Sequence, residues 1–215
     1  PPPPPPPPPP PSFLRRRRPP RSTPKPSAAA ADGYKRQNTI SITSIPATHD
    51  HLMIISSLRT NTSRTNYGYT WANWRFNNDS GSNYGYEWGY ASSNTWAGYR
   101  ATALDSLVYA GIACNANTSS GAFSYSKHYI PNYTSTDRAK VVILEWFDNA
   151  NDTGSGQGDL DSYPPYDWIQ DGAGAWTPST NAAINRIDMT LLDGLSSTVT
   201  IQEHSSVVIY GFTEE

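Results

Sequence analysis

Cysteine is almost absent from this chain of 215 residues, and so are long apolar runs. Cys114 is the one cysteine, so no disulfide forms within the chain, and a lone cysteine is most often a small buried apolar residue. No apolar run approaches the roughly 20 residues that a membrane-spanning helix needs. Residues 1–11 are all proline and supply no apolar segment, so we expect no signal peptide there.

Lysine and glutamate are also scarce, and the chain is instead rich in β-branched, aromatic, Asn, Ser, Thr and Gly residues. This composition favours strands and turns over helices. Between residues 37 and 213 we find nine to eleven short strand candidates separated by turn signals, with no helical periodicity. Sheets without helices each need one buried face, so we predict an all-β domain over residues 37–215, built as an antiparallel β-sandwich or barrel.

Residues 1–36 have a different composition and form an extended Pro/Arg-rich arm. Eleven prolines lock φ and remove every backbone donor, which predicts a polyproline II helix. Phe13 and Leu14 follow, and then four arginines, Arg15, Arg16, Arg17 and Arg18. The arm carries eight lysines or arginines and one acid (+7), whereas the rest carries eight and seventeen (−9). We therefore expect the arm to bind an acidic partner, and a neighbouring copy fits better than nucleic acid, since the arginines lack interleaved aromatics.

The aromatic stretch over residues 71–90, WANWRFNNDSGSNYGYEWGY, predicts a β-hairpin. Trp74 and Phe76 share one strand face before the polar segment, and Tyr84, Tyr86, Trp88 and Tyr90 share one after it. Asn, Asp, Ser and Gly between them tolerate positive φ or bond their own backbone, which suits a tight reversal.

Other strand candidates are marked by alternation or by short apolar runs. Residues 52–58 are predicted to form a central strand that is covered on both faces. Residues 91–98 are predicted to form a loop, and residues 148–166 a long acidic loop. The remaining candidate strands are residues 39–45, 104–113, 123–130, 141–147, 168–176, 184–192, 199–201 and 207–212.

Five stretches give the domain a resemblance to virion proteins of tailed bacteriophages encoded among tail, fibre or head-decoration genes. Residues 45–48 (IPAT), with Leu52 and Arg59 behind them, are similar to the family's "IPATYTDL…R", and residues 75–84 (RFNNDSGSNY) to its "RFNGDTGSNY". Residues 130–133 resemble its "IPNY", Trp176 with residues 181–184 its "W…AAI", and residues 210–212 its closing "LYGI". The long loop over 148–166 and the aromatics around Trp71 and Trp88 depart from the family pattern.

The resemblance implies a jelly-roll-like β-sandwich in a virion, with no known catalysis and no cofactor. We expect a symmetric homo-oligomer, with a trimer favoured, bound to the major capsid or tail protein. The arm residues Phe13, Leu14 and Arg15 to Arg18 would anchor it.

Residues that suggest chemistry have weaker support. His49 and His51 are expected to share a strand face and could share a metal, but two ligands do not define a site, and His128 and His204 stand apart. Carboxylates and amides over residues 148–161 suit calcium but match no known loop pattern. Aromatic residues beside Asn and Asp form a candidate glycan or receptor surface, which core and interface packing would equally explain. The candidate contacts are Tyr67, Tyr69, Trp71, Tyr86, Trp88 and Trp96.

These observations predict a non-enzymatic virion structural protein. The alternatives are a carbohydrate- or receptor-binding module on the same particle, and a glycosylated, proline-rich surface fibril subunit. The fibril alternative is kept open by Asn-X-Ser/Thr sequons, such as the one at Asn61, together with the polyproline arm.

Overall fold

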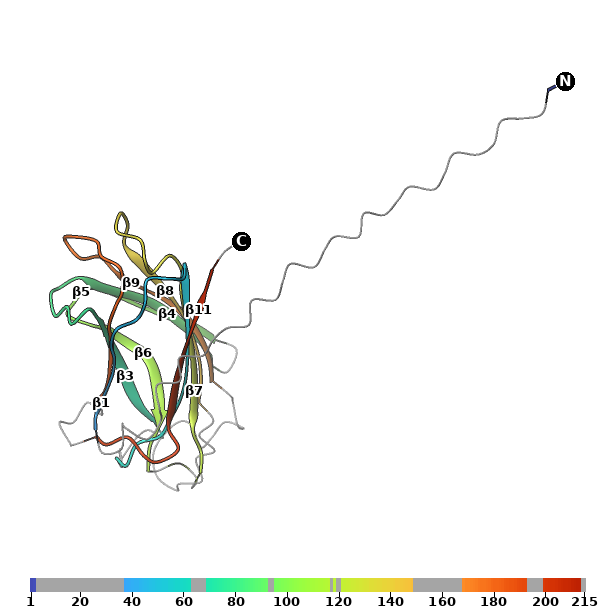
Figure 1. Cartoon of the computed structure of the whole chain (residues 1–215). Helices are drawn as coiled ribbons and strands as arrows, with labels where there is room; N and C mark the ends of the chain where they lie inside the picture. Colours follow the sequence, from blue (N-terminus) through green and yellow to red (C-terminus); the bar gives the residue numbers. More distant parts are fainter. Residues whose placement is uncertain are drawn as a thin grey trace.

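The computed structural model describes residues 1–2, 37–62, 69–92, 95–116, 118, 121–148, 168–192 and 199–213. Within these residues the protein consists of eleven strands in two antiparallel sheets and has no helix (Figure 1). Accordingly, none of these residues belongs to a helix that could cross a membrane. The all-β sandwich expected from the sequence is confirmed.

The smaller sheet has four strands in the order β1-β10-β3-β6. They are β1 (Thr39–Ile42), β10 (Ile187–Leu192), β3 (Tyr69–Phe76) and β6 (Leu107–Cys114). Pairing of β1 with β10 joins residues near the two ends of the domain, with Ile42 opposite Ile187.

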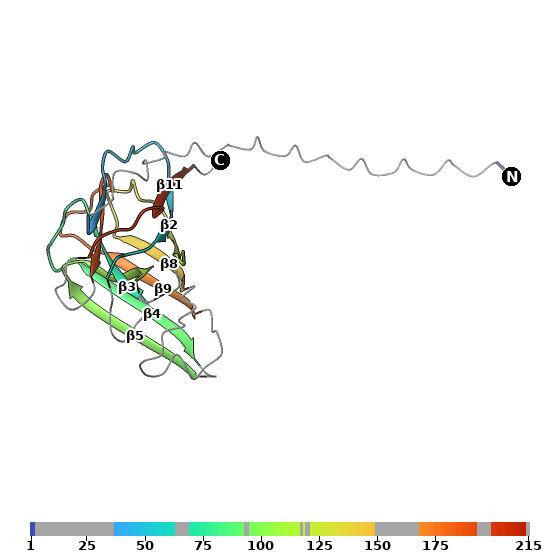
Figure 2. The ribbon, with the colours of Figure 1, turned by 90° about the horizontal axis from the view of Figure 1, so that it is seen from below.

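The larger sheet has seven strands in the order β11-β2-β7-β8-β9-β4-β5, and Figure 2 shows most of them side by side. They are β11 (Ser206–Phe212), β2 (His51–Leu58), β7 (Ser124–Ile130), β8 (Lys140–Asp148), β9 (Trp168–Trp176), β4 (Tyr84–Ser92) and β5 (Thr95–Leu104).

The strand orders define a jelly-roll-like sandwich. A jelly roll of eight strands has the orders 1-8-3-6 and 2-7-4-5 in its two sheets. The same orders result here when the three consecutive strands β7, β8 and β9 take the place of the seventh strand and β10 that of the eighth. β11 then extends the larger sheet beyond β2.

The expected hairpin over residues 71–90 is wrong, because β3 and β4 belong to different sheets. Residues 77–83 carry the chain from one sheet to the other as an arch. Phe76 and Tyr84 therefore face each other across the core, with ring centroids 6.2 Å apart, instead of lying side by side in one sheet. Both side chains are almost fully buried. The predicted turn chemistry is confirmed, since Asn77 and Asn78 have φ values of 53° and 58°.

Two smaller expectations are also corrected. The predicted loop over 91–98 contains the end of β4 and the start of β5, which pair from Ser92 opposite Thr95. β2 is not covered on both faces, because its residues alternate between buried and half-buried. Leu52, Ile54 and Leu58 fill the core, whereas Met53 and Ile55 lie on the outer face.

The two ends of the sandwich differ in their connections. The arch end contains the links between β1 and β2, β3 and β4, β5 and β6, β7 and β8, and β9 and β10. In Figure 1 the β7–β8 link (yellow) and the β9–β10 link (orange) lie at the top. The described residues cover all five of these links. At the opposite end, the links from β2 to β3, β6 to β7 and β10 to β11 lie partly outside the described residues, and those from β4 to β5 and β8 to β9 lie wholly outside them.

Candidate functional site

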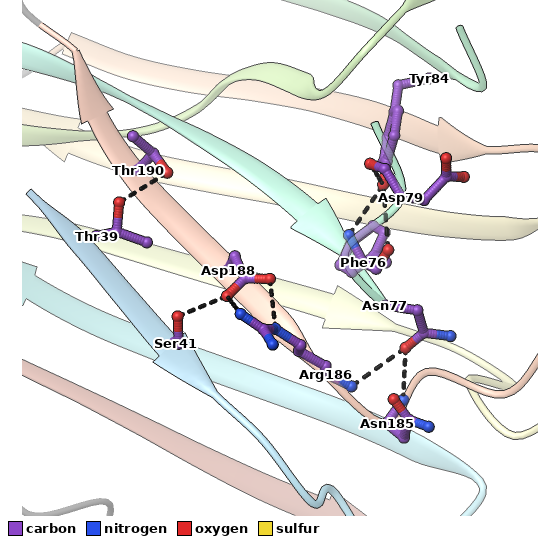
Figure 3. A network of polar contacts seen from close by, with 10 residues as sticks. All are labelled: Thr39, Ser41, Phe76, Asn77, Asp79, Tyr84, Asn185, Arg186, Asp188 and Thr190. Atoms are coloured by element: carbon purple, nitrogen blue, oxygen red, sulfur yellow. Dashed lines mark hydrogen bonds and ion pairs between the residues drawn. The ribbon is translucent and has the colours of Figure 1, made fainter. Parts of the chain in front are cut away.

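Polar side chains gather at the arch end, where Asn77 and Asp79 follow β3. Asn77 Oδ1 accepts hydrogen bonds from the backbone N of Asn185 (2.9 Å) and of Arg186 (3.2 Å), which Figure 3 shows. Its Nδ2 donates to the carbonyl of Ala183 at 2.7 Å. One asparagine thus holds the segment before β10 against the arch.

Asp79 accepts three hydrogen bonds at this end. Its Oδ1 accepts from Gly81 N at 2.8 Å, and its Oδ2 accepts from Asn83 Nδ2 at 2.9 Å and Trp176 Nε1 at 2.7 Å. Burial raises the pKa of Asp79, but the bonds from Trp176, Gly81 and Asn83 outweigh it and hold the pKa below its ordinary value. A carboxylate used in this way is a structural acceptor.

Tyr84 and Tyr133 complete the network. The Tyr84 hydroxyl accepts from Phe76 N at 2.9 Å and donates to the Asp79 carbonyl at 3.1 Å, and burial raises its pKa to about 12. The Tyr133 hydroxyl donates to the Pro46 carbonyl. We call the side chains of Asn77, Asp79, Asn83, Tyr84, Tyr133 and Trp176 the arch network.

All five stretches that carry the phage resemblance meet at this end. The backbone of Tyr133 donates to Asp50 (3.1 Å) and accepts from Ile184 (2.9 Å). Asp50 N donates to the Phe212 carbonyl at 2.8 Å, and the His49 ring packs so closely on Gly211 that a Cβ there would lie 2.1 Å from it. Arg59 is the exception, since it lies beyond β2 at the opposite end, where its Nη1 donates to Thr118 Oγ1 at 2.8 Å. These stretches therefore specify how the strands are connected.

The histidines do not form a metal centre. His49 lies before β2, contrary to the idea of a shared strand face, and its Nδ1 contacts Thr213 Oγ1 at 3.1 Å. His51 Nδ1 accepts from Asn132 N at 3.2 Å. Among the described residues, no three His, Cys, Asp or Glu side chains are grouped to hold a metal ion. The calcium candidate over 148–161 falls almost wholly outside these residues.

Three of the six candidate glycan-contact residues have described side chains, and all three lie wholly or partly in the interior. Trp88 is 9% exposed and lies within 6.2 Å of both Trp71 and Trp146, measured between ring centroids. Trp71 and Tyr86 are half-buried and pack against the core. Tyr67 lies outside the described residues, and so do the side chains of Tyr69 and Trp96.

Tyr99 of β5 is an exposed aromatic residue that the sequence did not identify as a candidate. It is 50% exposed and stacks on Trp88 with ring centroids 4.7 Å apart and planes 25° apart. The direct pairing of Trp88 with Tyr99 in the β4–β5 ladder explains this contact. Because residues 91–98 were predicted to be a loop, the pairing of β4 with β5 was not expected, and neither was the contact between Trp88 and Tyr99.

The outer face of the smaller sheet is polar. Ser41 donates to Asp188 Oδ1 at 2.6 Å, and Arg186 binds both oxygens of Asp188 at 2.7 and 2.8 Å (Figure 3). Burial raises the pKa of Asp188, but the bonds from Arg186 and Ser41 outweigh it and leave the pKa lowered. Thr39 and Thr190 add a hydroxyl pair at 3.1 Å.

The outer face of the larger sheet, in contrast, is largely apolar. Along each strand, the side chains of this face alternate with side chains that point into the core, namely Ile54, Ile130, Val142 and Leu144. A shallow pocket of about 290 Å³ lies on it, lined by Met53, Lys127, Tyr129, Ile143 and Glu145. Lys127 Nζ bonds Glu145 Oε2 at 2.7 Å, and that hydrogen bond raises the Lys127 pKa. Val141 and Ile143 are each 45% exposed, so this face is the main candidate interaction surface.

Comparison of the chain with protein-family models, with curated proteins and with solved structures found no match in any of the three. The predicted anchor residues Phe13, Leu14 and Arg15 to Arg18 lie outside the described residues.

Proposed function

We propose that this chain is a non-enzymatic structural protein of a tailed-phage virion. It would decorate or cement the capsid or the tail as a homo-oligomer, held by its N-terminal arm. The observation that carries the proposal is the convergence of the five phage-like stretches on the arch end. A resemblance made of fold-determining contacts favours a shared jelly-roll-like domain rather than chance identity in scattered turns.

The chemistry of the arch end also supports a structural role. Asp79 accepts three hydrogen bonds from Gly81, Asn83 and Trp176, and Asn77 uses both ends of its amide on backbone groups. Groups committed to such bonds are poor candidates for a nucleophile or a general base, which need a free reacting atom.

Deleting the arm tests the proposal directly. A chain that starts at Gly33 is compared with the full chain in sedimentation with purified phage particles that lack the protein. We expect the full chain to sediment with the particles and the shortened chain to stay in solution, both as the same oligomer by light scattering. Equal sedimentation of the two chains would contradict an anchoring arm, and binding of neither would contradict the virion role.

A second matched variant separates charge from stiffness. Replacing Arg15 to Arg18 by serine keeps the eleven prolines and removes four positive charges. We expect this variant to sediment less with the particles than the full chain does. Its sedimentation should also depend less on salt, because salt screens the attraction between the arginines and the particle, which the variant lacks.

Tyr99 supports glycan or receptor binding as a second candidate function. An exposed aromatic ring stacked on a tryptophan is a surface on which a sugar ring can pack. Tyr99→Ala is a better test than Trp88→Ala, because Trp88 is nearly buried and its loss would disturb the core. Loss of glycan-array binding in Tyr99→Ala but not in Tyr125→Ala, at 38% exposure, would favour this function.

A further inference from the structure

The outer face of the larger sheet carries one row of neighbouring side chains that crosses five strands. The strand registers place Tyr210, Met53, Tyr129, Ile143 and Ala173 side by side, from β11 through β2, β7 and β8 to β9. All five are half-buried or exposed. Because neighbouring strands are about 4.8 Å apart, Tyr210 and Tyr129 lie about 10 Å from each other along this row.

That spacing fits a polyproline II helix laid across the strands. Such a helix repeats every three residues and rises about 3.1 Å per residue, so equivalent prolines recur about every 9 Å. Proline-rich segments commonly dock on shallow apolar surfaces lined by aromatic rings, because the helix is already ordered and loses little entropy. The chain itself contains such a ligand in its eleven N-terminal prolines.

The residues that follow the prolines match the next part of the row. The pocket lined by Met53, Tyr129 and Ile143 is apolar and has the Glu145 carboxylate at its side. Phe13 and Leu14 are the first large apolar residues of the arm, and Arg15 follows them directly. An apolar side chain in the pocket would bring an arginine within reach of Glu145, which already holds the Lys127 ammonium at 2.7 Å.

The point where the domain begins favours docking on the same chain. The Gln37 carbonyl accepts a hydrogen bond from Ile201 N at 3.0 Å, five residues before β11 starts. From there, strand dimensions place the pocket roughly 25 Å away, along β11 and across two strands. The 22 residues between Leu14 and Gln37 reach about 75 Å when fully extended, so they are long enough to span this distance. A tether long enough to span the distance makes docking on the same chain an intramolecular event, with an effective concentration set by its length.

We propose that the N-terminal arm of each chain docks on the outer face of its own larger sheet. The prolines cross Tyr210 and Tyr129, and Phe13 or Leu14 fills the pocket beside Ile143. The inference goes beyond the proposed virion role and does not depend on it. If both hold, the free subunit keeps its anchor covered, and binding to a particle exchanges this contact for another.

Photo-crosslinking in the full chain tests the docking. p-Benzoylphenylalanine replaces Ile143 in one variant and Leu192 in the matched control, which is 43% exposed on the smaller sheet against 45% for Ile143. We expect position 143 to crosslink to residues 1–18 and position 192 not to do so. In ¹⁴N- and ¹⁵N-labelled chains that are unfolded and refolded together, so that any oligomer contains both labels, the crosslinked peptides should carry one isotope only.

Each other outcome contradicts the proposal. Mixed-isotope crosslinks to residues 1–18 would mean docking on a second copy, and crosslinks to body residues of another chain would mean that this face is a subunit interface. Absence of crosslinks from position 143 would mean that the arm does not dock there. None of these results bears on sedimentation with phage particles, so the two proposals fail separately.

A second measurement, which needs only a small substitution, tests the docking without the bulky crosslinking residue. Trypsin cuts between Arg15 and Arg18, and a docked arm should be cut more slowly. We expect Ile143→Ser to speed this cleavage by about tenfold, the factor for roughly 1.4 kcal/mol of lost docking energy. Leu192→Ser should leave the rate unchanged. Equal cleavage rates in wild type and Ile143→Ser would also contradict docking.

Discussion

Buried histidine in an apolar core makes a single residue sensitive to pH. His128 is fully buried on β7, its ring centroid lies 4.0 Å from that of Trp74, and its Nε2 contacts the Ala110 carbonyl. Burial lowers the pKa of His128 to about 4, against the opposing effect of hydrogen bonds to the backbone of Ala110 and Ile54. The folded protein therefore holds a neutral imidazole that the unfolded chain would protonate near pH 6.5.

We predict that the free energy of unfolding falls between pH 6.5 and pH 4. In this window the unfolded chain binds more protons than the folded chain, so stability is fully present above pH 6.5 and is lost as the pH approaches 4. The size of the shift corresponds to roughly 3 kcal/mol. Urea unfolding followed at several pH values measures it, and His128→Gln should flatten the slope while lowering stability at pH 7. A flat wild-type profile would show that His128 is not neutralised by burial.

Among the elements of the larger sheet, β4 and β9 approach each other closely. β9 has glycine at positions 172 and 174, and Gly172 pairs directly with Trp88 of β4. A Cβ at Gly172 would lie 2.7 Å from Trp88 Cβ and 2.8 Å from the Glu87 carbonyl oxygen. The β4–β9 ladder therefore depends on the missing side chain, since the obstacle includes backbone.

We predict that Gly172→Ala destabilises the protein by about 1–3 kcal/mol, the usual cost of forced overpacking. Gly98→Ala in β5 is the matched control, because the nearest atom to its Cβ would lie 3.9 Å away. Thermal and urea unfolding of both variants provide the measurement. A Gly172→Ala protein as stable as the control would show that β4 and β9 separate easily.

The elements also show which parts of this fold could be read from the sequence. Alternation and turn residues located most strands, and they predicted the positive φ of Asn77 and Asn78 correctly. They did not predict the partner of β3, because residues 77–83 suit a hairpin and an arch equally, and the choice depends on β10, more than a hundred residues away.

The candidate site was harder to predict for the same reason. Exposure of Tyr99 and burial of Trp88 follow from the position of β5 at the sheet edge, which no local pattern encodes. The apolar row on the larger sheet likewise depends on five strand registers at once. The sequence carries local traces of it in the apolar runs over 52–58 and 141–147, which have apolar residues on both strand faces.

At the scale of the whole molecule, pairing of remote segments closes the sandwich. β1 pairs with β10, and β11 pairs with β2. Each pairing joins a strand near the start of the domain to a strand near its end. Val207 and Ile209 of β11 are buried in the core, and Ile40 of β1 is fully buried. The core residues that the structure describes all lie after residue 37.

We predict that the two ends of the chain respond oppositely to truncation. A chain that starts at Gly33 should unfold cooperatively with the urea dependence of the full chain, because it keeps every core residue that the structure describes. A chain that stops before Ser206 should lose near-ultraviolet circular dichroism, because β2 becomes an unpaired edge and Val207 and Ile209 are removed. A folded product from the second truncation would show that β11 is an accessory strand.

The placement of β1 and β11 also determines how the domain resists a pulling force. The described domain begins at Gln37, at the end opposite the arch, and β11 ends at the arch end, where Phe212 pairs with His51, the first residue of β2. Tension between the two termini therefore runs parallel to the terminal strands. The four residue pairs of β1 with β10 and the seven of β11 with β2 are then loaded in shear, so they must break together instead of one after another. Such a domain transmits tension from its arm to its last strand without unravelling.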